Sequence, residues 1–215
     1  MIKYNTVIWD LDGTLLDTLT DLMNSINFAL AKFDYPPRTL EQIRTSVGNG
    51  VRVLMELSIP DGLSNPNYDE AFEIFSEHYA EHNMDNTGPY AGVVDVINKL
   101  SEMGVKQAIV SNKVDSGVQT LNKAFFGVDT AIGVQDGLER KPAPDMVWKA
   151  MGILGADKAT TVYIGDSEVD LATARNSELD SISVLWGFRS AEELAPHNPM
   201  RMVTEPSEIL EIISC

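Results

Sequence analysis

Strand and helix patterns alternate along the second half of the chain, and this alternation constrains the fold more than any other feature. Short apolar, β-branched runs predict strands, and apolar residues at helical spacing predict helices. The patterns predict strands over residues 105–110, 130–134, 161–164, 181–185 and 202–203, and helices over residues 93–103, 114–126, 142–153, 169–175 and 207–213. Such alternation is typical of a parallel sheet with helices on both faces.

The segment before this alternation has a different character, because residues 16–84 show helix patterns and no convincing strand. Prolines and glycines separate the helical stretches. Helices are predicted over residues 17–33, 39–44, 51–57 and 68–83. We therefore expect an α/β domain with a Rossmann-like parallel sheet, formed by residues 1–16 and 87–215, and a small all-helical domain formed by residues 17–86.

Two aspartates follow the first predicted strand. An apolar, β-branched run over residues 4–9 leads directly into Asp10-Leu-Asp-Gly-Thr14. Residues two apart in an extended chain point to the same side, so Asp10 and Asp12 can converge on one point. Gly13 allows the backbone to turn sharply and its N–H to approach an anion. Two neighbouring carboxylates repel each other when they are buried, so the sequence implies a metal cation.

Further polar residues follow the other predicted strands. In an open parallel sheet, ligands bind beyond the carboxyl ends of the strands. Ser111 and Asn112 come after one strand, and Asp166 and Asp170 come after another. Lys141 stands directly before a helix that we expect to start at Pro142. A hydroxyl, a lysine and four carboxylates at one edge are what a phosphoryl-transfer site with a divalent metal requires.

Four ordered motifs resemble those of the haloacid dehalogenase superfamily of phosphohydrolases. They are Asp10-Leu-Asp-Gly-Thr-Leu, Ser111 after an apolar strand, Lys141 before a proline, and Gly165-Asp-Ser-x-x-Asp170. The helical segment resembles the cap domain of that family, so the resemblance covers nearly the whole chain. Within the superfamily, residues 46–56, 111–113 and 185–189 are similar to those of phosphoglycolate phosphatases.

The resemblance implies a role for each catalytic position. Asp10 would attack phosphorus and form an aspartyl-phosphate. Asp12 would protonate the leaving group and then take a proton from the attacking water. Gly13, Ser111, Asn112 and Lys141 would bind the phosphate, with Ser111 and Lys141 also counted as catalytic.

The resemblance also implies a metal site and substrate contacts from the cap. Asp10, Asp12, Asp166 and Asp170 would form the Mg²⁺ site, Asp12 through its main-chain carbonyl and Asp170 as a support from one helical turn further on. Asn49 and Arg52 of the cap would contact the substrate. Helix N-termini and amides would balance the remaining negative charge.

The expected function is a Mg²⁺-dependent phosphatase acting on a small phosphomonoester, with 2-phosphoglycolate as the first choice. Alternatives are a phosphomutase acting on sugar phosphates, similar to β-phosphoglucomutase, and a pyrophosphatase or nucleotidase. Outside enzymes, a phospho-acceptor signalling receiver and an inactive binding protein of the same fold remain open. Dehalogenation is disfavoured, because that chemistry does not need the second acid, Asp12.

Composition limits the partners. The chain of 215 residues has 32 acidic and 16 basic side chains, and its net charge of −16 disfavours nucleic acid. No window approaches the roughly 20 apolar residues of a membrane span, and no signal-peptide pattern precedes the first strand. We therefore expect a cytoplasmic protein without a membrane partner. Cys215 is the only cysteine, so a disulfide framework is not expected.

Overall fold

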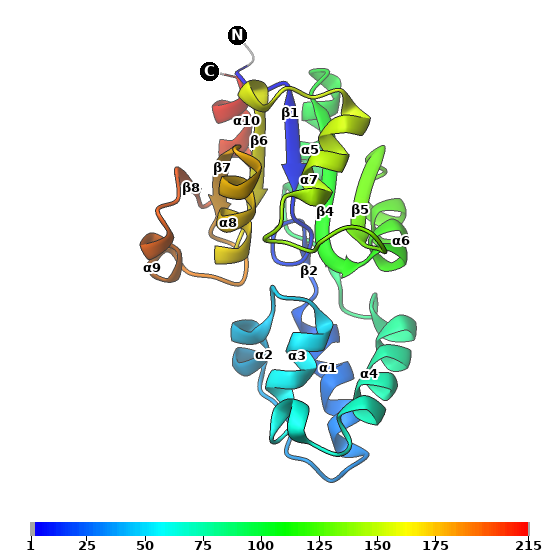
Figure 1. Ribbon diagram of the computed structural model, residues 1–215. Helices are drawn as coiled ribbons and strands as arrows, with labels where there is room; N and C mark the ends of the chain where they lie inside the picture. The colour runs from blue at the N-terminus through cyan, green and yellow to red at the C-terminus, as the bar shows by residue number, and fades with distance from the viewer. Residues whose placement is uncertain (1–2, 215) are drawn as a thin grey trace. The chain divides into compact units, whose positions relative to one another are not determined.

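The computed structural model describes residues 3–214 and divides into two compact units (Figure 1). One unit comprises the chain up to Leu16 and from Pro89 onward, and the other comprises Asp17–Gly88. The second boundary lies two residues later than the one expected from the sequence. Cys215, which entered the expectation about disulfides, lies outside the described residues.

The larger unit contains a sheet of six strands with the order β5-β4-β1-β6-β7-β8. The strands are β1 (Thr6–Trp9), β4 (Lys106–Val114), β5 (Thr130–Val134), β6 (Thr161–Gly165), β7 (Asp180–Val184) and β8 (Arg201–Val203). All the pairings along this sheet are parallel. The central strand β1 is buried throughout and pairs Trp9 with Ile109 of β4 and with Ile164 of β6. The carboxyl ends of β1, β4 and β6 therefore meet at one edge.

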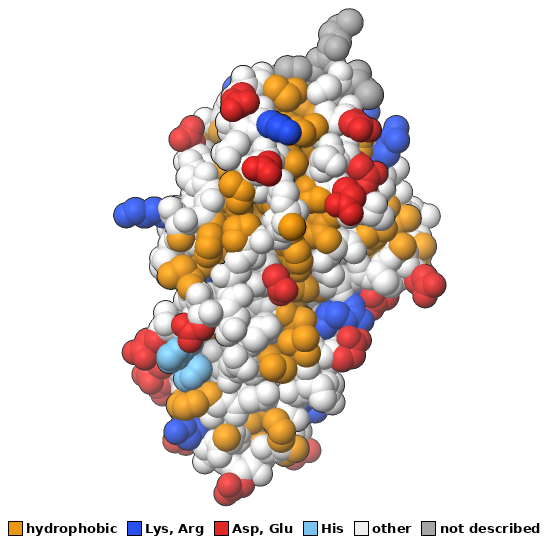
Figure 2. Space-filling view, turned by 180° about the vertical axis from the view of Figure 1, so that it is seen from behind, with side chains coloured by type: hydrophobic (Ala, Val, Ile, Leu, Met, Phe, Trp, Pro, Cys, Tyr) orange, Lys and Arg blue, Asp and Glu red, His pale blue; other side chains and the backbone are white. Residues whose placement is uncertain are grey.

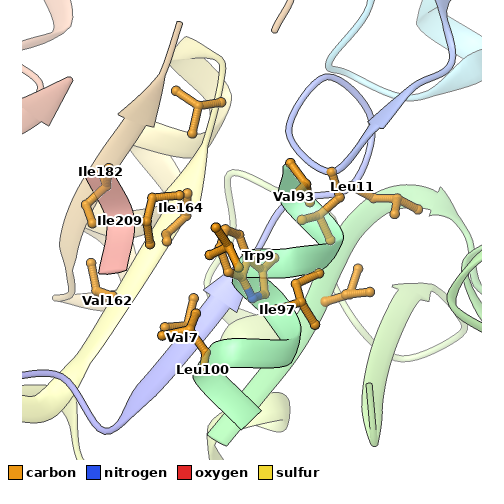
Figure 3. Close-up of a cluster of buried hydrophobic side chains, with 14 of the residues drawn as sticks. Val7, Trp9, Leu11, Val93, Ile97, Leu100, Val162, Ile164, Ile182 and Ile209 are labelled. Carbon is orange, nitrogen blue, oxygen red and sulfur yellow. The ribbon is translucent and has the colours of Figure 1, made fainter. Parts of the chain in front are cut away.

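Helices cover both faces of this sheet. One face packs against α5 (Val93–Glu102), α6 (Asp115–Phe125) and α10 (Ser207–Ile213), and the other against α7 (Asp145–Leu154) and α8 (Glu168–Ser177). Successive residues of β1 point to opposite faces. Val7 and Trp9 belong to the first core cluster, in which Trp9 lies beside Ile97 of α5 (Figure 3), whereas Ile8 belongs to the second. The structure confirms the expected α/β class.

Two elements at the edge of the sheet differ from the sequence-based expectation. Strand β4 runs on to Val114 and not only to residue 110, with a register shift against β5 between Val110 and Val114. Ser111 therefore lies in the irregular last part of the strand and not after it. Helix α7 begins at Asp145 and not at Pro142, and both Lys141 and Pro142, which are joined by a cis peptide bond, belong to the preceding loop. A short helix, α9 (Ala191–Leu194), was not expected.

The smaller unit is helical. It contains α1 (Leu19–Ala31), α2 (Leu40–Ser46), α3 (Val51–Ser58), the 3₁₀ turn Gly62–Ser64 and α4 (Tyr68–His82). Buried side chains on one stripe of α1, such as Ile26, and of α4, such as Phe75, supply its core. The two chain segments that join the units pair as a two-stranded sheet of β2 (Leu16–Asp17) and β3 (Gly88–Pro89). The sequence-based reading of residues 16–84 contained no strand.

Acidic side chains are scattered over the face of the molecule drawn in Figure 2, which fits an excess negative charge spread over the surface. None of the helices in the described part of the chain combines the length and apolar character that crossing a membrane requires.

A buried carboxylate ties the beginning of the helical unit to its end. Asp21 of α1 accepts hydrogen bonds from the backbone N–H of Asn86 at 3.0 Å and of Thr87 at 2.9 Å, and from both side chains at 2.8 Å. Burial alone acts in the opposite direction, but these hydrogen bonds lower the pKa of Asp21 below its usual range. The Asp21 carboxylate thus links the first helix of the helical unit to the last residues of that unit.

We expect Asp21→Asn to lower the free energy of unfolding by about 1.5–3 kcal/mol, because an amide N–H₂ would face buried donors that now contact a carboxylate oxygen. Urea unfolding measures the change. Glu73→Gln on the exposed side of α4 is the matched control, and an equal effect of the two substitutions would contradict this account.

Candidate active site

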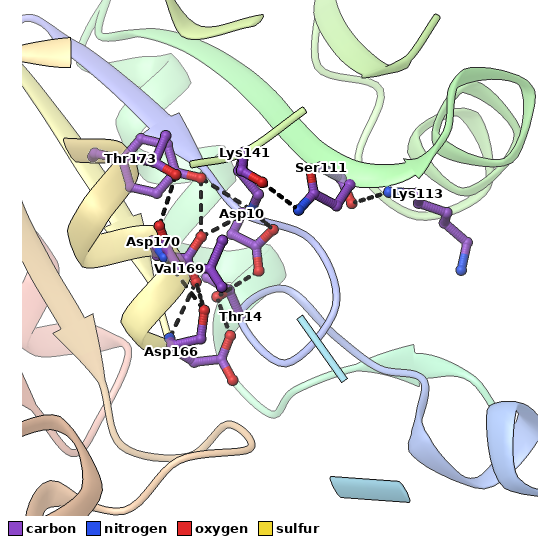
Figure 4. Close-up of polar contacts among 12 residues, drawn as sticks. Asp10, Thr14, Ser111, Lys113, Lys141, Asp166, Val169, Asp170 and Thr173 are labelled. Atoms are coloured by element: carbon purple, nitrogen blue, oxygen red, sulfur yellow. Dashed lines mark hydrogen bonds and ion pairs between the residues drawn. The ribbon is translucent and has the colours of Figure 1, made fainter. Parts of the chain in front are cut away.

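The carboxyl ends of the three central strands bring the expected polar residues together. Asp10 follows β1, Ser111 lies near the end of β4, and Asp166 follows β6. All three residues are buried, at 6%, 2% and 1% exposure. The fold therefore places residues that lie far apart in the sequence at one edge, as the strand-end argument predicts (Figure 4).

A buried lysine connects two of the carboxylates. The Nζ of Lys141 donates to Asp10 Oδ1 at 2.5 Å and to Asp170 Oδ1 at 2.8 Å, and it lies 3.2 Å from the Tyr163 hydroxyl. Burial would lower the pKa of Lys141, but the charges of Asp10 and Asp170 raise it well above its usual value. The neighbouring charges therefore favour the charged form of the lysine, and three oxygen atoms hold its ammonium group.

The pKa of Asp10 is raised well above its usual value. Burial is the main cause and the charge of Asp170 adds to it, whereas Lys141 acts in the opposite direction. Thr14 Oγ1 lies 3.5 Å from the second oxygen of Asp10. In the metal-free protein, one lysine is thus insufficient to stabilise the full negative charge of the cluster.

Asp166 is held by the main chain of a neighbouring loop. Its Oδ2 accepts from the Phe188 N–H at 2.7 Å, and its Oδ1 accepts from Thr14 Oγ1 at 3.1 Å. Burial, with the charge of Asp170, raises the pKa of Asp166 to about 7 despite these two hydrogen bonds. The two hydrogen bonds therefore orient the Asp166 carboxyl group, but the groups around it do not fully stabilise its negative charge.

Asp170 differs from Asp166 because two donors of this chain contact each of its oxygens, whereas one donor contacts each oxygen of Asp166. Oδ1 accepts from Lys141 and from Tyr163, and Oδ2 accepts from the N–H of Ser167 at 3.1 Å and from its hydroxyl at 2.6 Å. Ser167 and Asp170 form the capping box of α8. Asp170 thus anchors both the start of α8 and the ammonium group of Lys141.

The remaining expected residues of this unit lie around the cluster. The Asp12 side chain is more exposed than that of Asp10, at 18% against 8%, and its Oδ1 lies 3.5 Å from Lys113 Nζ. Ser111 Oγ accepts from the Lys113 N–H at 3.2 Å. Asn112 Nδ2 donates to the main-chain oxygen of Lys141 at 3.0 Å, so it also stabilises the loop that carries the lysine.

Two glycines make the close packing of the site possible. Gly13 has a φ of +92°, and a Cβ there would collide with the carboxylate of Asp166. A Cβ at Gly187 would collide with the main-chain oxygen of Gly13 and with Asp166. The indole N–H of Trp186 donates to the main-chain oxygen of Thr14 at 3.0 Å. The first loop and the 185–189 loop are therefore in direct contact.

The carboxylates fit a hard dication. Asp10, Asp166 and Asp170 each offer an oxygen within 4.8 Å of the others, and all three are buried. Three buried carboxylates against one ammonium leave an excess of negative charge, and oxygen ligands suit Mg²⁺. Each oxygen of Asp170 already accepts two hydrogen bonds, whereas each oxygen of Asp10 and Asp166 accepts one. Asp10 and Asp166 therefore fit direct coordination better, and Asp170 fits a supporting role.

Sequence reasoning assigned no role to four residues that the structure brings to the site. Thr14 and the Phe188 N–H orient Asp166, Tyr163 contacts Lys141, and Lys113 contacts Asp12. A signal existed for Tyr163, because a tyrosine within a wholly buried strand needs a partner for its hydroxyl. The main-chain donor at Phe188 has no sequence signal.

Asn49 and Arg52 belong to the helical unit, so their contact with a substrate stays a prediction. Asn49 is exposed and lies just before α3. The guanidinium of Arg52 lies over the ring of Phe72, 4.4 Å from its centroid, and the main-chain oxygen of Arg52 accepts from the Tyr68 hydroxyl at 2.9 Å. The described contacts of Arg52 are thus packing contacts within that unit.

Comparison with known proteins agrees with this geometry. Residues 7–184 match the model of the haloacid dehalogenase-like hydrolase family. A phosphoglycolate phosphatase from Mesorhizobium japonicum is 30% identical over 88% of this chain and 87% of its own length. One from Pseudomonas aeruginosa is 28% identical over 95% of this chain and 78% of its own length.

A solved structure is similar over almost the full length. The crystal structure of a candidate phosphoglycolate phosphatase from Lactobacillus delbrueckii subsp. bulgaricus has 37% identity and a TM-score of 0.94, with 99% of each chain covered. These findings confirm the resemblance and the enzyme class inferred from the sequence. The chain is a phosphatase that belongs to the haloacid dehalogenase-like hydrolase family.

Proposed function

We propose that this protein is a Mg²⁺-dependent phosphatase that hydrolyses a small phosphomonoester, 2-phosphoglycolate as the first choice, through an aspartyl-phosphate on Asp10. The observation that carries the proposal is the buried contact of Asp10 with Lys141, next to Asp166 and two residues before Asp12. The names of the relatives support the choice of substrate.

In the first half of the proposed reaction, a carboxylate oxygen of Asp10 attacks phosphorus and the bond to the leaving oxygen breaks. Lys141 holds Asp10 in position and offsets negative charge on the transferring phosphoryl group. Asp12 protonates the leaving oxygen. Ser111 and main-chain N–H groups of the first loop bind the phosphoryl oxygens.

In the second half, Asp12 takes a proton from a water molecule whose oxygen attacks phosphorus, and the bond to Asp10 breaks to release phosphate. The greater exposure of Asp12 than of Asp10 suits contact with both water and leaving group. Mg²⁺, held by Asp10, Asp166 and the main-chain carbonyl of Asp12, would neutralise carboxylate charge and polarise the phosphoryl group.

We further propose that the helical unit acts as a cap that selects the substrate and shelters the reaction from water. Its connection to the larger unit by two paired segments, β2 and β3, supports this role.

Asp10→Asn is expected to lower phosphate release from a panel of phosphorylated metabolites by at least about 10³-fold, because the nucleophile is lost. Asp95→Asn, on the exposed side of α5, is the matched control. Substantial turnover by a folded Asp10→Asn variant would refute the nucleophile assignment.

The same panel of phosphorylated metabolites, assayed with Mg²⁺ and with a chelator, tests whether the reaction needs the metal. It also ranks 2-phosphoglycolate against pyrophosphate, nucleotides and sugar phosphates.

The raised pKa of Asp166 predicts how pH affects the metal-free protein. Between about pH 4 and 7, folded Asp166 keeps a proton that the unfolded chain has lost. The free energy of unfolding should therefore fall as pH rises through this window, by at most about 1.4 kcal/mol per pH unit from this group.

Asp166→Asn removes this penalty, so at pH 8 the metal-free variant should melt a few degrees above the metal-free wild type. Adding Mg²⁺ should raise the melting temperature of the wild type and have little effect on the variant. Differential scanning calorimetry measures both. An equal Mg²⁺ response in the two proteins would contradict the role of Asp166 in the metal site.

The cap proposal predicts that Asn49→Ala changes KM for 2-phosphoglycolate more than kcat for p-nitrophenyl phosphate, a substrate with a generic aryl leaving group. Steady-state kinetics on both substrates provide the comparison. An equal loss of kcat/KM on the two would count against substrate selection by this residue.

A further inference from the structure

Lys113 is a nearly buried cation to which the proposed reaction assigns no role. Its side chain is 7% exposed, and its Nζ lies 3.5 Å from Asp12 Oδ1. Figure 4 shows Lys113 beside Ser111, with its side chain extending away from the group formed by Asp10, Lys141 and Asp170. A second lysine therefore lies next to the proton carrier, apart from the lysine that holds the nucleophile.

The main chain of Lys113 is closely fixed by its surroundings. Its N–H donates to Ser111 Oγ at 3.2 Å, and a Cβ at Gly133 of β5 would lie 2.6 Å from its main-chain oxygen. Its aliphatic stem lies along α6, where a Cβ at Gly117 would be 3.5 Å from Cε. The main chain is thus held against β5, and the side chain places its ammonium group 3.5 Å from Asp12 Oδ1.

We propose that Lys113 recognises a negative charge on the leaving group of the substrate, so that the enzyme prefers phosphate esters whose leaving group is an anion, such as 2-phosphoglycolate. This inference rests on the proposed function, because it uses Asp12 as the group that protonates the leaving oxygen. It adds a residue of the larger unit to the substrate selection proposed for the cap.

The geometry supports this assignment. Proton transfer requires the leaving oxygen to lie within about 3 Å of the Asp12 carboxyl group. A carboxylate one carbon beyond that oxygen then comes within ion-pair reach of an ammonium group that lies 3.5 Å from the same carboxyl group. A neutral leaving group such as ethanol offers Lys113 no such partner.

Charge and burial support it as well. Asp10, Asp12, Asp166 and Asp170 carry four potential negative charges at this edge, so a further anion on the substrate would be repelled without an additional cation. A nearly buried ammonium is weakly screened by water and salt, so its interaction with an anion is stronger than that of a surface lysine. The flexible stem of a lysine lets the ammonium move between Asp12 and the substrate.

The test compares kcat/KM for 2-phosphoglycolate with kcat/KM for ethyl phosphate, whose leaving group is neutral, in the full-length Mg²⁺-loaded enzyme. Lys113→Met should lower the ratio of the two values by about 10- to 100-fold, mainly through KM for 2-phosphoglycolate. Lys113→Arg keeps the charge and should retain more of the ratio than Lys113→Met. Lys123→Met, on the exposed side of α6, is the matched control and should leave the ratio unchanged.

Pyrophosphate, whose leaving group is also an anion, serves as a third substrate. A loss shared by pyrophosphate and 2-phosphoglycolate supports recognition of charge, and a loss confined to 2-phosphoglycolate supports recognition of a carboxylate. An unchanged ratio, or an equal loss on all three substrates in a variant that unfolds at the wild-type temperature, overturns the inference. A wild-type enzyme that hydrolyses other phosphomonoesters but none of these three would instead refute the choice of 2-phosphoglycolate as substrate.

Discussion

The contact of the buried Lys141 ammonium with Asp10 and Asp170 is the interaction on which the site depends. Removing one partner from such a buried set leaves an uncompensated charge, which costs several kcal/mol. Tyr163 and Ser167 donate further hydrogen bonds to Asp170, and these contacts restrict the orientation of the group. Asp10, the proposed nucleophile, is thereby oriented before any substrate arrives, which is what catalysis by positioning requires.

This arrangement is stabilising only in part, because the carboxylates outnumber the ammonium group. Burial is the main cause of the raised pKa values of Asp10 and Asp166, and repulsion from Asp170 adds to both shifts. The buried apolar core around β1 and Trp9 stabilises the fold and offsets the destabilising effect of the buried carboxylates. A bound dication and a phosphoryl group are the natural partners of a site in this state, and this complementarity links the fold to its chemistry.

Much of this could be predicted from the sequence, for physical reasons. The alternation of strand and helix patterns predicted the parallel sheet. Ligands bind at the carboxyl ends of parallel strands, and this rule predicted that Asp10, Ser111, Lys141 and Asp166 lie at one edge. The pattern could not predict the extension of β4 through residues 111–113, because those polar residues do not continue an apolar run. Nor could it predict main-chain donors such as the Phe188 N–H, because every residue except proline carries one.

The central claim is that Asp10, held by Lys141, becomes phosphorylated during turnover. The most direct test is to quench the enzyme with acid while it hydrolyses 2-phosphoglycolate or another accepted phosphomonoester, reduce the acyl phosphate with borohydride, and analyse the peptides by mass spectrometry. The account predicts homoserine at position 10. Reduction at a different aspartate, or an unmodified Asp10 in an enzyme trapped during rapid turnover with a rate-limiting second step, would contradict it.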